Sequence, residues 1–87
     1  MKLTLDCKSF DNKCALLKEF QKTFDEMYGL SYDALIDGAR SYQNELTVYI
    51  ENADRYEDEQ NLRETLDIIT RENPLIKILY KNTSCPQ

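Results

Sequence analysis

Two carboxylates four residues apart, Asp33 and Asp37, have the spacing in this sequence that is most suited to chemistry. Paired carboxylates can divide the roles of general acid and general base when one of them is desolvated in a cleft. On an exposed surface they instead bind the Arg and Lys side chains of another molecule. The surrounding residues 25–39 contain two more acids and no basic residue, interleaved with aromatic side chains such as Tyr28 and Tyr32. This mixture indicates a surface that binds a basic protein.

The residues that an enzyme or a metal site needs are missing. The sequence has no His to act as a base near neutral pH, and no G-x-S-x-G, Gly-rich phosphate loop or C-x-x-C motif. Its three cysteines, Cys7, Cys14 and Cys85, are too dispersed for a metal site, and the acidic run at residues 54–59 lacks the glycine of a calcium loop. We therefore expect a protein without catalytic activity, metal or cofactor.

Charge is distributed unevenly along the chain. Residues 1–24 contain five Lys and three acids, residues 25–72 contain thirteen acids and four Arg, and residues 73–87 contain two Lys. The acidic middle is unsuited to direct binding of nucleic acid, because phosphate binding needs clustered Lys or Arg. It favours a basic partner, because opposite potentials accelerate the encounter.

Nothing in the sequence indicates a membrane segment or a signal peptide. The apolar stretches are a few residues long, far below the roughly 20 that span a bilayer. Asp6 interrupts the N-terminal segment before a signal-peptide apolar region can develop. An odd number of cysteines is most simply interpreted as free thiols in a reducing compartment, with Cys7 and Cys14 in the core. We expect a cytoplasmic monomer.

The first part of the chain has the pattern of a strand followed by a helix. Residues 2–7 alternate polar and apolar side chains, which is typical of a strand with one buried face. Apolar residues then recur at intervals of three and four from Cys14 to Phe24, after a capping residue such as Asn12. The spacing predicts an amphipathic helix that ends before Gly29.

The two acids fall on a second predicted helix, at about residues 32–42. Ser31 is suited to cap its N-terminus, and Asp33 in its first turn is favoured by the helix dipole. At 100° per residue, one side of the helix forms an apolar stripe of Leu35, Ala39 and Tyr42. Asp33 and Asp37 fall on the opposite side, so we expect both to point outward.

The second half of the chain alternates strands with one helix. Residues 46–51 are β-branched and aromatic, which predicts a strand. Residues 62–69 have helical apolar spacing, and Pro74 disfavours helix at Asn73. Residues 75–80 form a nearly continuous apolar run, which predicts a central strand covered on both faces. We expect a flexible tail at residues 82–87.

These elements predict the α/β class, with a single domain over residues 1–81. Strands separated by helices favour a parallel sheet with right-handed crossovers, and here the helices are expected to cover its faces. The order of elements gives three strands and three helices.

A simpler interpretation of the acidic helix remains open at this point. Asp33 can merely support the helix start, Asp37 can pair with Arg40, and the tyrosines can be half-buried packing residues. Residue types alone favour this interpretation, because charged helix faces are common on soluble proteins.

Residues 28–37 resemble the Tyr-Gly-x-Asn-Leu-Asp-Ala-Leu-Trp-Asp signature of the barstar family. The matching stretch is Tyr28-Gly29-Leu30-Ser31-Tyr32-Asp33-Ala34-Leu35-Ile36-Asp37. The order of strands and helices over residues 2–81 also resembles that family. The resemblance implies a three-stranded parallel sheet packed against three helices, and a cytosolic inhibitor of an extracellular-type guanyl-specific ribonuclease or a similar basic nuclease.

In that family the second helix and the loop before it enter the nuclease active site, where carboxylates take the place of RNA phosphates. The resemblance implies that Asp37 is the principal phosphate mimic and Asp33 a second acid. It implies further partner contacts at Tyr28, Ser31, Tyr32, Ile36 and Tyr42.

Departures from the signature leave the target nuclease open. Ile36 replaces Trp, Tyr32 replaces Leu, and Arg40 adds a cation close to the acidic face. An acid from the third helix could contribute as well, with Glu64, Asp67 and Glu72 as candidates. The alternative is an interaction module of similar fold that binds another basic partner without inhibiting a nuclease.

Overall fold

The sheet has three parallel strands in the order of the chain. The computed structural model describes residues 1–10, 12–25 and 27–81. Strand β1 (Lys2–Asp6) pairs with β2 (Leu46–Glu51), and β2 pairs with β3 (Ile76–Lys81). The α/β class and the three-stranded parallel sheet are as predicted.

The apolar strand at the end of the sequence is an edge strand, and the prediction that it is central was wrong. In the sheet order β1-β2-β3, the middle position belongs to β2. The inward residues Leu46, Val48 and Ile50 of β2 are fully buried. On β3, Leu79 and Tyr80 remain 46% and 41% exposed. A continuous apolar run therefore marked a strand here but not its position in the sheet.

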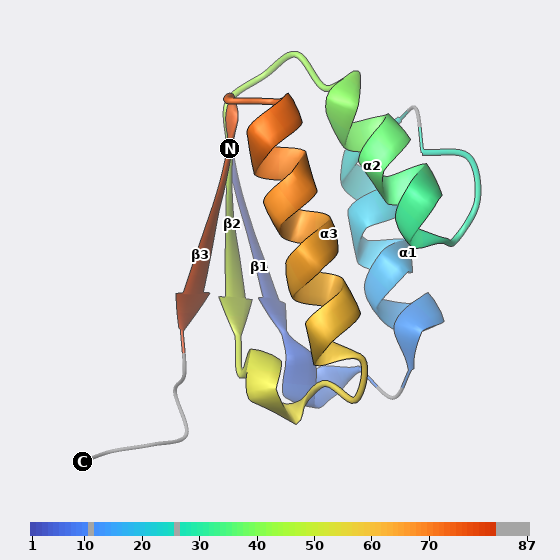
Figure 1. Cartoon of the computed structure of the whole chain (residues 1–87), viewed down its shortest axis with the longest axis vertical. Coiled ribbons are helices and arrows are strands. Elements are labelled where there is room, and N and C mark those ends of the chain that lie inside the picture. Colours follow the sequence, from blue (N-terminus) through green and yellow to red (C-terminus); the bar gives the residue numbers. More distant parts are fainter. Residues whose placement is uncertain (11, 26, 82–87) are drawn as a thin grey trace.

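Three helices lie on one side of this sheet (Figure 1). They are α1 (Lys13–Thr23), α2 (Tyr32–Arg40) and α3 (Glu59–Glu72). Right-handed crossovers that add each strand in the same direction place every connecting helix on the same face. The expectation that helices cover both faces was therefore wrong, and Thr4 and Lys77 are exposed on the open face. Short 3-10 turns, η1 (Cys7–Ser9) and η2 (Ala53–Arg55), follow β1 and β2.

Local chemistry explains the helix ends. Asn12 Oδ1 accepts a hydrogen bond from Ala15 N at 2.9 Å, which caps α1. Ser31 Oγ accepts one from Ala34 N at 3.1 Å, so Ser31 caps α2 as predicted. Helix α2 ends at Arg40, two residues earlier than predicted.

The core lies between the helices and the sheet. Helix α1 contributes Leu16, Leu17 and Phe20, all essentially without exposed surface. Cys7 is buried as expected, but Cys14 is exposed, so its predicted place in the core was wrong. The buried stripe of α1 is centred on Leu17 and Phe20, and Cys14 lies off that stripe in the first turn. Cys85 and the predicted tail at residues 82–87 lie outside the described residues.

Asn73 fastens the end of α2 to the turn before β3. Its side chain is 6% exposed, and Nδ2 donates to Ala39 O and Tyr42 O, each at 2.8 Å. Its Oδ1 accepts from Leu75 N at 3.0 Å. One amide group therefore satisfies three backbone groups that come from two distant parts of the chain.

The described ranges hold neither a membrane-spanning helix nor a cluster of metal ligands. Over residues 1–10, 12–25 and 27–81, no helix is long and apolar enough to cross a membrane. The same ranges contain no group of three or more His, Cys, Asp or Glu side chains placed to hold a metal ion.

The two described cysteines should react differently with thiol reagents. Burial, followed by the neighbouring Asp6 carboxylate, raises the pKa of Cys7 to about 11, so only about one molecule in a thousand carries this thiolate at pH 8. In a Cys85→Ser variant, iodoacetamide at pH 8 should modify Cys14 and leave Cys7 unmodified, as read by peptide mass spectrometry. Modification of both in the unfolded chain is the control. Equal labelling in the folded protein would contradict the buried position of Cys7.

Replacement of Asn73 should destabilise the protein. Asn73→Ala removes the hydrogen bonds to three buried or partly buried backbone groups, and the expected loss in free energy of unfolding is about 2–3 kcal/mol in urea titration. Asn44→Ala, at an exposed position in the connection after α2, is the matched control and should change stability by less than about 0.5 kcal/mol. Equal stability of the two variants would show that the Asn73 contacts contribute little.

Candidate protein-binding surface

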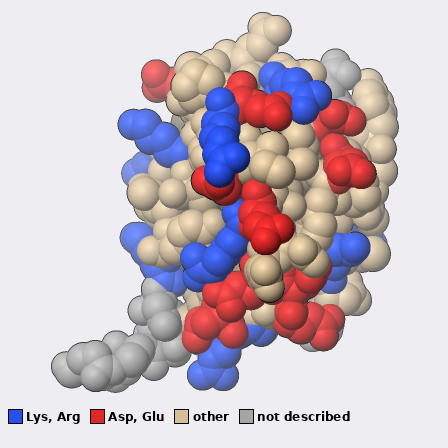
Figure 2. Space-filling model, in the orientation of Figure 1, with Lys and Arg blue, Asp and Glu red and all other residues tan. Residues whose placement is uncertain are grey.

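Asp33 and Asp37 lie on the outer face of α2, as the helical spacing predicts. Both are exposed, whereas Leu35 and Ala39 on the opposite side are fully buried. Figure 2 shows acidic side chains over α2, at the right of the molecule. The Ser31 cap holds the first turn, so the two carboxylates project from a fixed helix one turn apart.

Asp37 also takes part in an ion pair within the chain. Arg40 Nη1 lies 3.3 Å from Asp37 Oδ1, so the pairing considered from the sequence is present. Arg40 Nε lies closer, at 2.5 Å, to Glu72 Oε1 on α3. The hydrogen bond to Glu72 is the main cause that raises the pKa of Arg40, and Asp37 contributes least. Arg40 is therefore paired more closely with Glu72 than with Asp37, and the Asp37 side chain stays 70% exposed.

Tyr32 turns its hydroxyl group toward the segment that precedes α3. The hydroxyl donates to Asp58 Oδ2 at 2.8 Å and lies 3.4 Å from the Tyr56 hydroxyl. Burial, together with these hydrogen bonds, raises the pKa of Tyr32 far above its usual value. Lys13 Nζ lies 5.2 Å from the centre of its ring. Tyr32 therefore anchors the start of α2 and presents only part of its surface to a partner.

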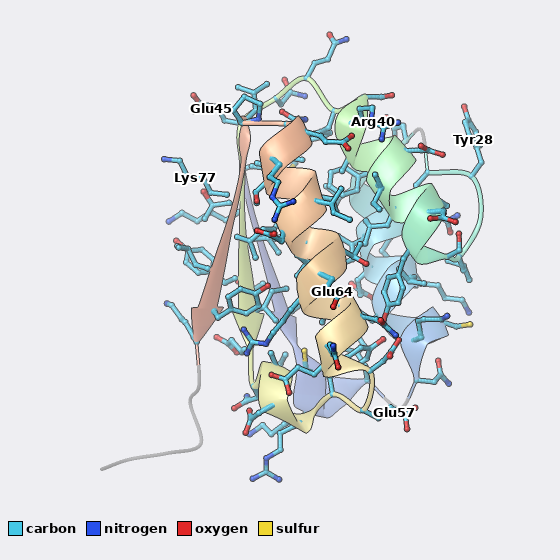
Figure 3. The ribbon with its side chains drawn as sticks, viewed as in Figure 1. Tyr28, Arg40, Glu45, Glu57, Glu64 and Lys77 are labelled. Carbon is cyan, nitrogen blue, oxygen red and sulfur yellow. The ribbon has the colours of Figure 1, made fainter. Side chains whose placement is uncertain are left out.

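The other predicted contact residues lie in different surroundings. Tyr28, in the loop before α2, is 80% exposed and points away from the body of the protein (Figure 3). Ile36 is half-buried against the core. Tyr42 lies beyond the end of α2, where its ring packs edge-on against Phe24 at 5.1 Å and its hydroxyl donates to Met1 Sδ. The exposed surface thus combines Tyr28, Ser31, Asp33 and Asp37, with parts of Tyr32 and Ile36 at its margin.

Of the three acids of α3 considered from the sequence, Glu72 is the one that an ion pair links to α2. Asp67 pairs with Arg71 on its own helix, and Glu64 accepts from Gln60. Glu72 lies 32 positions after Arg40, and no local pattern could have indicated this contact. The hydrogen bond between Tyr32 and Asp58 was missed for the same reason.

Gly38 lets α2 approach the loop that carries Tyr28. A Cβ atom at this position would lie 2.9 Å from Met27 Cβ and 3.1 Å from Met27 Cα. Met27 is itself buried, and its carbonyl oxygen accepts a hydrogen bond from Gln21 Nε2 at 3.2 Å. The loop before the acidic helix is therefore held on two sides, by α1 and by α2.

An added methyl group at this contact should be costly. Gly38→Ala gains about 1 kcal/mol in helix propensity, but the clash with the Met27 backbone should outweigh it and give a net loss of about 1–2 kcal/mol. Thermal unfolding monitored by circular dichroism measures the difference. A variant more stable than the wild type would show that the loop can move away from α2 without cost.

Comparison with known proteins adds no family to this description. No family model matches the sequence, and no curated protein matches it either.

Proposed function

We propose that this protein inhibits a ribonuclease by covering its basic active site with α2 and the preceding loop. The observation that carries the proposal is the pair of exposed carboxylates, Asp33 and Asp37, one turn apart on a capped helix beside the exposed Tyr28. Asp37 would take the principal phosphate position and Asp33 a second one. The local resemblance to the barstar signature supports the same assignment.

The physical basis is mimicry of a substrate by fixed charges. A ribonuclease holds Arg and Lys side chains in place for RNA phosphates, and carboxylates can satisfy them with charge-assisted hydrogen bonds. Residues four apart on a helix have Cβ atoms about 5–6 Å apart, close enough for neighbouring cations of one cleft to meet both. Because the helix is already ordered, little conformational entropy is lost when the complex forms.

The ion pair with Arg40 does not prevent this role. An exposed pair of this kind contributes at most about 1 kcal/mol, so a partner's cations can replace it at little cost. When Asp37 binds a cation of the partner, Arg40 still pairs with Glu72. The Glu72 carboxylate then reduces the repulsion between Arg40 and a basic cleft. Arg40 therefore moderates the negative charge of the α2 surface, and its ion pair with Glu72 on α3 holds it in place.

The overall charge supports fast association. The chain has a net charge of −5, and the segment that includes α2 and α3 contains thirteen acids and four Arg. An acidic protein and a basic enzyme attract one another over distances of about a Debye length. The proposed role needs no catalytic group, metal or cofactor, and it would protect a cell that makes an exported ribonuclease.

The alternative is an interaction module that binds another basic protein without inhibition. The partial burial of Tyr32 and Ile36 favours it, because Tyr28 is then the large side chain that is mainly exposed beside the acids. An assay that measures binding and RNA cleavage together separates the two functions.

Truncation of Asp37 should weaken inhibition more than truncation of Asp33. Inhibition constants are measured with a fluorogenic RNA against secreted guanyl-specific ribonucleases. Asp37→Ala should weaken binding by about 2–5 kcal/mol, which raises the inhibition constant by about 30- to 5,000-fold. This range is typical of a truncated charge pair in an interface, and it is based in part on complexes of the barstar family. Asp33→Ala should cost less, and Asp54→Ala, at an exposed position on η2, is the control with the same charge change.

Unchanged inhibition by Asp37→Ala, or an equal loss for Asp54→Ala, would rule out the proposed anchor. Absence of inhibition by the wild type, together with binding to a basic protein that does not cleave RNA, would support the alternative function.

A further inference from the structure

Strand β3 is an apolar edge of the sheet that no other element of the described chain covers. It lies at the outer left of the sheet in Figure 1, on the far side from α2. Three large hydrophobic residues at this edge are substantially exposed, namely Leu75, Leu79 and Tyr80 at 39%, 46% and 41%. Natural proteins usually protect such an edge, because its backbone groups can pair with another strand.

The backbone of β3 has groups available for pairing. Leu46 N donates to Leu75 O at one end of the ladder, and Asn52 N donates to Lys81 O at the other. Odd-numbered residues of β3 therefore direct their backbone groups toward β2. Alternate residues of a strand direct these groups to opposite edges, so those of Ile78 and Tyr80 point away from the sheet.

A groove of about 430 Å³ runs beside this edge, between β3 and α3. Leu66, Ile78 and Tyr80 provide apolar lining, and Thr70 and Asp67 lie along the helix side. The Arg63 guanidinium lies 4.3 Å from the centre of the Tyr80 ring. Aromatic and Arg side chains of this kind are enriched in protein interfaces.

We propose that the occupant of this edge is a second copy of the chain, whose β3 pairs antiparallel with the first to form a continuous six-stranded sheet. The twofold axis would pass through the pair of Ile78 residues, and the groove beside each β3 would receive side chains from the partner. This inference concerns a surface remote from α2 and does not depend on the proposed function. It replaces the expectation of a monomer.

The sequence of β3 is self-complementary in this register. Residues whose numbers add to 156 face each other, so Ile76 faces Tyr80 of the second copy and Ile78 faces its own equivalent. These three cross-strand pairs on the helix side consist of Ile side chains and the Tyr80 ring, without a charged group. On the open face Lys77 lies opposite Leu79, and Lys81 lies opposite Leu75, so each Lys can extend its stem over a Leu.

Moving the twofold axis by one residue along β3 is disfavoured. With the axis at Leu79, Lys77 of each copy would face Lys81 of the other, and like charges directly opposite one another are destabilising. The Ile78 register avoids this conflict and pairs an aromatic with a β-branched residue twice, which is favourable in antiparallel sheets.

Charge also favours this edge over other surfaces. Two copies with a net charge of −5 each repel one another, but β3 itself contains two Lys and no acid. The two β3 strands can therefore approach without juxtaposing acids, and the acids that line the groove, Glu64 and Asp67, lie on α3 rather than on the strand. Because α2 lies on the opposite side of the molecule, its acidic face would stay accessible in both copies (Figure 1).

The first test is the mass of the full chain as a function of concentration. Sedimentation equilibrium from about 10 μM to 1 mM should show a monomer–dimer equilibrium, weak because one strand edge and one groove form a small interface. Hydrogen exchange should show that the amides of Ile78 and Tyr80 gain protection as the concentration rises. A monomer throughout this range would overturn the proposal.

Charge variants on the open face test the register. Leu79→Lys places like charges opposite each other twice and should weaken the dimer at least tenfold, whereas Lys77→Glu combined with Leu79→Lys should restore it. Thr4→Lys, exposed on the same face of the opposite edge strand, is the matched control and should have little effect. An equal effect of Thr4→Lys, or a dimer that all these variants leave unchanged, would show that another surface is used. Protection of Ile78 only after addition of an unrelated extended peptide would also contradict self-association.

Discussion

The structure depends on the way in which its three strands are connected. Each parallel crossover adds the next strand on the same side of the last, so all three helices must lie on one face of the sheet. Helix α2 packs against α3 and α1 on this face. The outer side of α2 is consequently available for charged residues. The same topology leaves β3 at an edge, so the acidic surface and the apolar edge arise from one constraint at opposite sides of the molecule.

Polar contacts fix the position of α2 at both ends. The hydroxyl of Tyr32 binds Asp58 near the start of the helix, and Asn73 binds two carbonyl groups at its end. Between them, Gly38 allows the close approach to Met27. These contacts hold the helix in place, and the proposed imitation of bound phosphates would depend on such a fixed position. A carboxylate that is already in place loses less conformational entropy when it meets a partner's cations.

The simpler interpretation of the acidic helix is partly confirmed, and the binding role stays a proposal. Asp37 does pair with Arg40 and Tyr32 is half-buried, as the simpler interpretation held, but Tyr28 is 80% exposed. Even so, Asp37 is mostly exposed because Glu72 holds Arg40 more closely. The ion pairs of Arg40 therefore leave the Asp37 carboxylate accessible, as the proposed binding role needs.

The sequence by itself determined the class of fold, the order of strands and helices and the outward direction of Asp33 and Asp37, because these follow from local periodicity and from capping by residues such as Ser31. It did not determine that β3 is an edge strand, because a run of apolar residues looks the same at an edge and in the centre. The prediction that Cys14 lies in the core was also wrong, because packing decides whether a borderline position in the first helical turn is buried. Only the tertiary structure could bring Glu72 to Arg40 and Asp58 to Tyr32, because contacts across tens of residues depend on how the helices pack.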